Sequence, residues 1–181
     1  DRLGIDHGDE YSDFPGLIWN LIHELGHTFN LSHSNSLDCG EESIASNCTN
    51  TEYGNVFDSM GGWAGRIFNF LQQKKVGWIN DSNILEISGP GNYFINSLQT
   101  KNGIVGAKIY VPGIPYPVFA IEHRKATGFD STLPSNVSNG LILYSLINPN
   151  QTTSWPLTDW GMQWRLVDAH PTNLPIFDDV S

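Results

Sequence analysis

The first regular pattern along the chain is a group of apolar residues that recur three or four positions apart. They are Ile18, Leu21, Ile22, Leu25 and Phe29. This spacing is typical of a helix with one apolar stripe; Ser12 or Asp13 can cap its start, and Pro15 suits its first turn. The pattern therefore predicts a helix that ends near residue 29 and packs this stripe against the core.

A second helix is expected over residues 66–76. The segment supplies apolar side chains at helical spacing, and Lys74 and Lys75 suit the negative end of the helix dipole. Gly77 can then stop the helix.

From residue 80 onward the pattern changes to short β-prone runs separated by Gly, Pro and Asn. Candidate strands cover residues 84–87, 93–95, 107–111, 118–122, 141–147 and 164–167. The change indicates an α+β protein in two parts. Residues 1–79 hold the helices, and residues 80–181 form a β-rich, sandwich-like unit.

The composition limits the partners of this chain. Of its 181 residues 39% are apolar, which is enough for a core, and the formal net charge is −10. Nucleic-acid binding demands clustered Lys and Arg, so the acidity argues against it and indicates solubility instead. No apolar run is long enough to cross a membrane.

Two groups of residues invite a functional interpretation that we do not favour. Trp155, Trp160 and Trp164 offer stacking faces for a sugar, but aromatic clusters more often serve packing. The run Glu122-His123-Arg124-Lys125 ends a candidate strand and offers charges to an acidic partner. A solvated strand end is the simpler interpretation of that run.

The candidate chemistry lies in the first helix, in the run His23-Glu24-Leu25-Gly26-His27. Two histidines four positions apart project from one face of a helix, close enough to hold one Zn²⁺. Glu24 lies beside them, where a carboxylate can take a proton from a metal-bound water. The alternative is that both histidines are ordinary surface or core residues.

His33, six residues after His27, favours the metal interpretation. It completes three protein ligands and leaves one coordination position open, as in catalytic zinc sites. With six His in the chain, a third His at one fixed offset is roughly a 3% event by chance. A straight helix would carry His33 away from the others, so the chain must turn after Phe29. Asn30 suits that turn because Asn, after Gly, best tolerates left-handed backbone.

The extended pattern H-E-x-x-H-x-x-N-x-x-H resembles that of the metzincin clan of zinc endopeptidases. The clan's second hallmark is a methionine in a tight turn beneath the metal, and Asp58-Ser59-Met60-Gly61-Gly62 is similar to it. By this resemblance Met60 forms an apolar floor under the ligands and does not bind zinc. Taken alone, Met60 would be an ordinary core residue.

Three segments are most similar to the gametolysin-like branch of the clan. They are Glu52-Tyr53-Gly54-Asn55-Val56-Phe57, the methionine segment and Lys75-Val76-Gly77-Trp78-Ile79. Some metzincins carry a tyrosine two residues after the methionine that reaches the metal or the substrate. Gly62 stands there in this chain, so that role has no counterpart at this position.

The resemblance also sets an expectation for the start of the chain. Metzincin catalytic domains usually place a twisted sheet, with the strand that pairs with substrate, before the zinc helix. Only 22 residues precede His23. Residues 1–79 are therefore expected to be the C-terminal part of a catalytic domain, truncated from a longer precursor, with one wall of the cleft missing.

The cysteines and sequons indicate an extracellular protein. Cys39 and Cys48 are the only cysteines, and a disulfide between them would close a small loop. A metal-binding pair is the alternative, but no second pair lies nearby to complete a site. Candidate N-glycosylation sites are Asn47, Asn80, Asn136 and Asn150.

The sequence therefore predicts a secreted zinc endopeptidase in which three histidines hold one catalytic Zn²⁺ and Glu24 is the general base. By resemblance to gametolysins, the substrate is an extracellular protein, such as a matrix or cell-wall glycoprotein. Two alternatives stay open: an incompetent fragment whose β-rich half binds glycan or protein, and a zinc hydrolase of a non-peptide bond. Cleavage preference and oligomeric state do not follow from the sequence.

Overall fold

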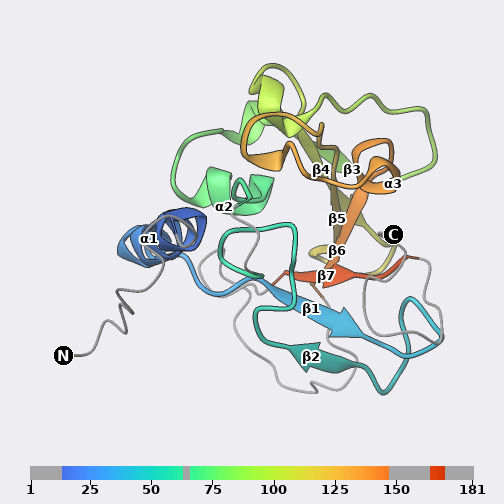
Figure 1. Ribbon diagram of the computed structural model, residues 1–181. Coiled ribbons are helices and arrows are strands. Elements are labelled where there is room, and N and C mark those ends of the chain that lie inside the picture. Colours follow the sequence, from blue (N-terminus) through green and yellow to red (C-terminus); the bar gives the residue numbers. More distant parts are fainter. Residues whose placement is uncertain (1–13, 63–65, 147–163, 170–181) are drawn as a thin grey trace.

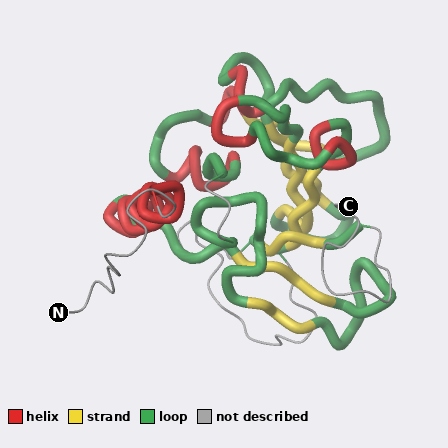
Figure 2. Tube along the Cα trace, in the orientation of Figure 1, coloured by secondary structure: helices red, strands yellow, loops and turns green. Residues whose placement is uncertain are grey.

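The computed structural model describes residues 14–62, 66–146 and 164–169. These residues form an α+β structure, as the sequence predicts, with one mixed sheet and few helices (Figure 1). Long loops connect the short elements (Figure 2). Within this part of the chain, no helix is long and apolar enough to span a membrane.

The helices agree with the predicted ones in place more than in length. They are α1 (Phe14–Thr28), α2 (Phe70–Lys75), α3 (Ser135–Ser138) and the 3₁₀ turns η1 (Asp81–Asn83), η2 (Leu98–Thr100) and η3 (Gly128–Asp130). Helix α2 begins later than expected because Asn69 caps it, its side chain accepting a hydrogen bond from the backbone N–H of Gln72. Gly77 has a φ of 78° just after the helix, as its predicted role requires.

The strands follow the predicted positions closely in the second half of the chain. They are β1 (Asn35–Asp38), β2 (Thr49–Thr51), β3 (Ile84–Ile87), β4 (Gly106–Tyr110), β5 (Pro117–Glu122), β6 (Ile142–Ser145) and β7 (Arg165–Val167). Residues 93–95 form no strand. Strands β1 and β2 have no counterpart in the prediction, because their residues are largely polar and give no alternating pattern.

The described strands form one seven-stranded sheet in the order β2-β1-β7-β6-β5-β4-β3. The pairs β1–β7 and β3–β4 are parallel and the other neighbours are antiparallel. The sheet twists, so that β1 and β2 run across Figure 1 whereas β4 and β5 run roughly from its top to its bottom.

The sandwich expected for residues 80–181 is wrong for the described part of the chain. Strand β7 does not belong to a second sheet. It pairs with both β6 and β1, and so connects the strands of the second half of the sequence to those of the first half. The division at residues 79 and 80 stays a prediction, although the sheet and its core draw on both sides of it.

Two apolar clusters hold the molecule together. The larger cluster lies on the sheet and consists of Phe57, Phe70, Ile79, Ile84, Leu98, Val105, Ala120, Leu133, Ile142, Tyr144 and Leu166. The smaller cluster consists of Leu31, Met60 and Phe68, with Ile22 of α1 and Val76 packed against it. The smaller cluster therefore joins α1 to the end of α2.

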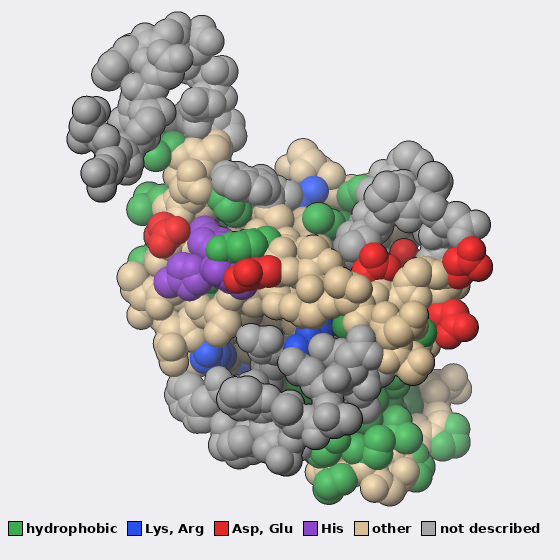
Figure 3. Space-filling model, turned by 90° about the horizontal axis from the view of Figure 1, so that it is seen from below, with side chains coloured by type: hydrophobic (Ala, Val, Ile, Leu, Met, Phe, Trp, Pro, Cys, Tyr) green, Lys and Arg blue, Asp and Glu red, His purple; other side chains and the backbone are tan. Residues whose placement is uncertain are grey.

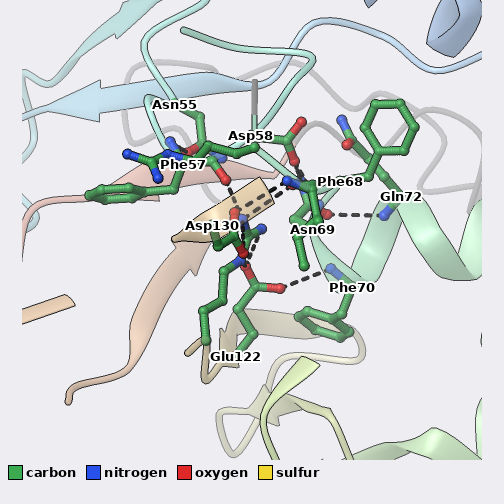
Figure 4. Close-up of polar contacts among 12 residues, drawn as sticks. Asn55, Phe57, Asp58, Phe68, Asn69, Phe70, Gln72, Glu122 and Asp130 are labelled. Atoms are coloured by element: carbon green, nitrogen blue, oxygen red, sulfur yellow. Dashed lines mark hydrogen bonds and ion pairs between the residues drawn. The ribbon is translucent and has the colours of Figure 1, made fainter. Parts of the chain in front are cut away.

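A buried polar network lies beside the larger cluster (Figure 4). Glu122 and Arg124 are both fully buried, so the interpretation of this run as a solvated strand end is wrong. The Nε of Arg124 donates to Glu122 Oε1 at 2.8 Å, and Glu122 Oε2 accepts from the backbone N–H of Phe70 at 2.9 Å. Because the two charges pair with each other, they can lie inside the protein.

The same network reaches the turn that holds Met60. Asp58 Oδ1 accepts from the N–H of Met60 at 2.7 Å, and Oδ2 accepts from the N–H of Asn69 at 2.8 Å (Figure 4). Burial raises the pKa of Asp58 from 3.8 to about 6, against the opposing effect of the charge on Arg124. Asp58 thus ties the Met60 turn to the start of α2.

Candidate metal centre

The face of helix α1 that packs against the protein differs from the predicted one. Of its predicted apolar stripe, Ile22 is half-buried, while Ile18, Leu21, Leu25 and Phe29 are 37%, 66%, 48% and 45% exposed. The prediction that this stripe packs against the core is therefore wrong for the described structure. The buried face carries Trp19, His23 and Gly26 instead.

The contacts of Gly26 and His23 explain this rotation. A Cβ at position 26 would meet the Sδ of Met60, and would lie 3.3 Å from the ring of Phe68. The glycine thus lets the helix backbone approach the smaller cluster closely. His23 then reaches the backbone carbonyl of Ser59, which no apolar side chain could satisfy.

The end of α1 forms the turn that the sequence predicts at Asn30. Asn30 has a φ of 62°, in the left-handed region. Its N–H donates to the carbonyl of His27 at 2.9 Å, and the N–H of Leu31 donates to the carbonyl of Gly26 at 3.0 Å. This pair of bonds is a Schellman motif, and Leu31 is buried beside Met60 and Phe68. The turn redirects the chain so that His33 returns to the helix.

The three predicted ligands come together at one place on the surface. His23, His27 and His33 form a group of possible metal ligands among the described residues, with ligand atoms within 4.8 Å of one another. His23 is buried, His33 is half-buried and His27 is exposed. Figure 3 shows histidine side chains gathered on this face with acidic side chains beside them.

Each histidine uses its Nδ1 atom to contact an acceptor on the protein. His23 Nδ1 lies 2.8 Å from the carbonyl of Ser59, and His27 Nδ1 lies 2.9 Å from the carbonyl of Leu31. His33 Nδ1 lies 2.7 Å from Glu52 Oε1. Carbonyls and carboxylates only accept hydrogen bonds, so these contacts place the hydrogen of each neutral ring on Nδ1.

The Nε2 atoms are then left with lone pairs that converge. Nε2 of His27 and Nε2 of His33 lie 3.2 Å apart, a distance at which two lone pairs repel unless a cation or proton lies between them. Nitrogen ligands of a tetrahedral Zn²⁺, each about 2.1 Å from the metal, are separated by about 3.4 Å. The separation of the Nε2 atoms of His27 and His33 is therefore close to the spacing between two ligands of one zinc ion.

Glu24 follows His23 on α1 and is exposed. Helical geometry places it about 60° around the helix axis from His27, on the side away from His23. Glu24 is thus an exposed carboxylate next to His27 on the helix surface.

Met60 lies in a tight turn that packs against α1. Its side chain is fully buried against α1, and the N–H of Gly61 donates to the carbonyl of Asp58 at 2.9 Å. The carbonyl of Met60 accepts from the N–H of Ser34 at 2.7 Å. The turn therefore contacts both the helix that carries His23 and the segment that follows His33.

The other predicted sites have different outcomes. The disulfide between Cys39 and Cys48 is confirmed. Asn47, Asn80 and Asn136 are exposed, and their glycosylation stays a prediction. Asn150, Trp155 and Trp160 lie outside the described residues, while Trp164 packs against the larger cluster.

Sequence reasoning assigned no role to Ser59, Glu52 and Tyr53, which contact the histidines directly. The carbonyl of Ser59 holds His23, Glu52 holds His33, and the ring of Tyr53 lies 3.9 Å from that of His33. The run Glu52-Tyr53-Gly54-Asn55 was the only indication in the sequence that this segment lies near the histidines. Spacing alone cannot pair a carboxylate or an aromatic ring with a distant histidine.

No family model, no curated protein and no solved structure matches this chain, so its function has to be argued from the site itself.

Proposed function

We propose that the chain is a zinc-dependent endopeptidase of the metzincin type, with His23, His27 and His33 as the ligands of one Zn²⁺. One observation carries this proposal: the three histidines bring ligand nitrogens within 4.8 Å of one another while each Nδ1 contacts an acceptor of the protein. Metal-binding histidines typically donate their second ring N–H in this way. Three neutral imidazoles favour zinc over the oxygen-seeking ions Ca²⁺ and Mg²⁺.

The arrangement also supports a catalytic role for the ion over a structural one. Three protein ligands would leave a fourth position open, and His27 is exposed to solvent, so water can reach the group. Zn²⁺ held by the three histidines would supply a Lewis acid for the scissile carbonyl and an activated water. Glu24 would serve as the general base.

Two features support the metzincin assignment within zinc peptidases. Asn30 adopts the left-handed turn that lets a third histidine join the first two, and Met60 lies buried in a tight turn under Gly26. The run from Glu52 to Phe57 supports the gametolysin-like branch. In this proposal Met60 stays an apolar floor and does not bind the metal.

The disulfide and the exposed sequons support secretion, because disulfides persist in oxidising compartments. The substrate is then an extracellular protein, such as a glycoprotein of a matrix or cell wall.

The proposal is tested by measuring zinc content and proteolysis together. Purified protein should hold one zinc per chain and cleave a denatured fluorescent protein in a chelator-sensitive reaction. Glu24→Gln should keep the zinc and lose at least about a hundredfold of the activity. Glu41→Gln is the matched control, since Glu41 is an exposed carboxylate outside the histidine group, and it should keep both.

Substoichiometric zinc, or chelator-sensitive cleavage that survives Glu24→Gln, would overturn the proposal. Full zinc occupancy without cleavage of any protein would favour the alternative of an incompetent fragment.

A further inference from the structure

His33 is held differently from the other two histidines. The Nδ1 atoms of His23 and His27 contact neutral backbone carbonyls, whereas that of His33 contacts the carboxylate of Glu52 at 2.7 Å. The ring of Tyr53 packs against the same imidazole, with centroids 3.9 Å apart and planes inclined by 36°. Two adjacent residues thus contact one ligand ring, at its edge and on its face.

We propose that Glu52 and Tyr53 are a pair of positioning residues for His33. Glu52 holds the hydrogen on Nδ1 and sets the direction of Nε2, and Tyr53 fixes the plane of the ring. This inference rests on the proposed function, because it concerns the same metal centre. It adds a residue pair that spacing alone could not assign to the metal.

The backbone that presents this pair is strained. Tyr53 has a φ of 60°, which costs a bulky residue about 1–2 kcal/mol. Such strain persists only where the surroundings impose it, and it is concentrated at functional sites. An observed outlier next to a ligand therefore points to a function of the segment.

The neighbouring contacts show what imposes the strain. The N–H of Tyr53 donates to Asn35 Oδ1 at 3.3 Å, and the N–H of Asn55 donates to the carbonyl of Ser34 at 3.1 Å. A Cβ at Gly54 would meet the Oγ of Ser36, so Gly54 allows a very close approach. The segment is thus fixed against the residues that directly follow His33.

Stability does not account for this arrangement. The side chain of Glu52 is 64% exposed and that of His33 is 24% exposed. A hydrogen bond to a carboxylate this open to solvent typically adds about 0–1 kcal/mol to the free energy of unfolding, which is about the size of the strain at Tyr53 or less. Loss of a residue that orients a metal ligand typically weakens metal binding 10- to 100-fold, which is a much larger effect.

The test uses Co²⁺ as a spectroscopic probe of the full chain. Its dissociation constant is measured by competition with a chelator, and its visible absorption reports the ligand geometry. Glu52→Ala should raise the dissociation constant about 10- to 100-fold and alter the absorption, and Glu52→Gln should fall between it and the wild type. Glu42→Gln removes one exposed carboxylate elsewhere and should stay within about twofold.

Tyr53→Gly separates the positioning role from a structural one. Glycine relieves the strain at φ 60°, so the metal-free variant should unfold at the same temperature as the wild type or higher. Its Co²⁺ affinity should nevertheless fall, because the ring on His33 is gone. A merely structural residue would lower both quantities together.

The outcomes distinguish this inference from the proposed function. A wild-type chain that binds neither Zn²⁺ nor Co²⁺ would refute the metal centre itself. Wild-type binding combined with unchanged affinity and absorption in Glu52→Ala would overturn only the role of Glu52. If metal-free Tyr53→Gly melts at a lower temperature than the wild type, the role of Tyr53 is structural.

Discussion

The Sδ atom of Met60 occupies the space that a Cβ at Gly26 would need. This contact brings the helix that carries His23 close enough to the Met60 turn for His23 Nδ1 to reach the carbonyl of Ser59 at 2.8 Å. The position of the metal centre therefore depends on an absent side chain.

Gly26→Ala is expected to destabilise the protein by about 1–3 kcal/mol, although alanine is the better helix former. Met60 is fully buried, so its side chain cannot move aside into solvent. Gly16→Ala is the matched control on the same helix: nothing lies within 4 Å of its added Cβ, so stability should stay equal or rise. Urea unfolding measures both. Equal effects of the two changes would contradict the close contact.

Asn30 allows the turn that returns His33 to the helix. Asn30→Gly should leave the free energy of unfolding unchanged or slightly higher, whereas Asn30→Ala should lower it by about 1 kcal/mol, because alanine tolerates a φ of 62° poorly. Asn139 is the control, since it is also an exposed asparagine but has a φ of −103°. Asn139→Ala should change the free energy of unfolding by less than about 0.5 kcal/mol.

Arg124 neutralises buried carboxylates behind the Met60 turn. Its NH2 group lies 2.7 Å from Glu122 Oε1 and its NH1 group lies 3.6 Å from Asp130 Oδ2. Arg124→Met should cost about 3–5 kcal/mol, because Glu122 is left charged and buried. The double variant with Glu122→Gln should recover part of this loss. Lys125→Met, at the exposed neighbour, should have almost no effect in thermal unfolding.

Asp58 should make stability depend on pH in the acid range. Its folded pKa of about 6 exceeds its ordinary value of 3.8, so the folded state binds the proton more tightly than the unfolded state. Its contribution to the free energy of unfolding is therefore most favourable below about pH 4 and falls as the pH rises to about 6. The whole change in this contribution is about 3 kcal/mol. Asp58→Asn removes this contribution.

The comparison is best made on metal-free protein by urea unfolding at each pH. The free energy of unfolding of Asp58→Asn minus that of the wild type should increase by up to about 3 kcal/mol between about pH 4 and pH 7. A difference that stays constant over this range would show that Asp58 does not titrate there.

Local chemistry explains which features the sequence could predict. The three histidines, the turn at Asn30 and the bridge between Cys39 and Cys48 depend on residue types at short spacing. Most strands after residue 80 could likewise be predicted from the sequence, because short apolar runs are separated by Gly and Pro.

Distant contacts decided what could not be predicted. The rotation of α1 is set by Ser59 and Met60, and an apolar stripe cannot reveal that a glycine and a histidine will face the protein instead. Glu122 and Arg124 look like solvated charges until their pairing is known. Strand β1 forms despite its polar residues because β7 lies beside it.

The insertion of β7 between β1 and β6 has a consequence for the order of assembly during synthesis. Asn35 pairs with Arg165, so β1, which directly follows His33, waits for one of the last described strands before it gains its parallel neighbour. Pairings of such high contact order form slowly, and the unpaired edges of β1 and β6 are open to aggregation until then. The proposed metal centre is therefore expected to form late, after nearly all of the described chain has left the ribosome.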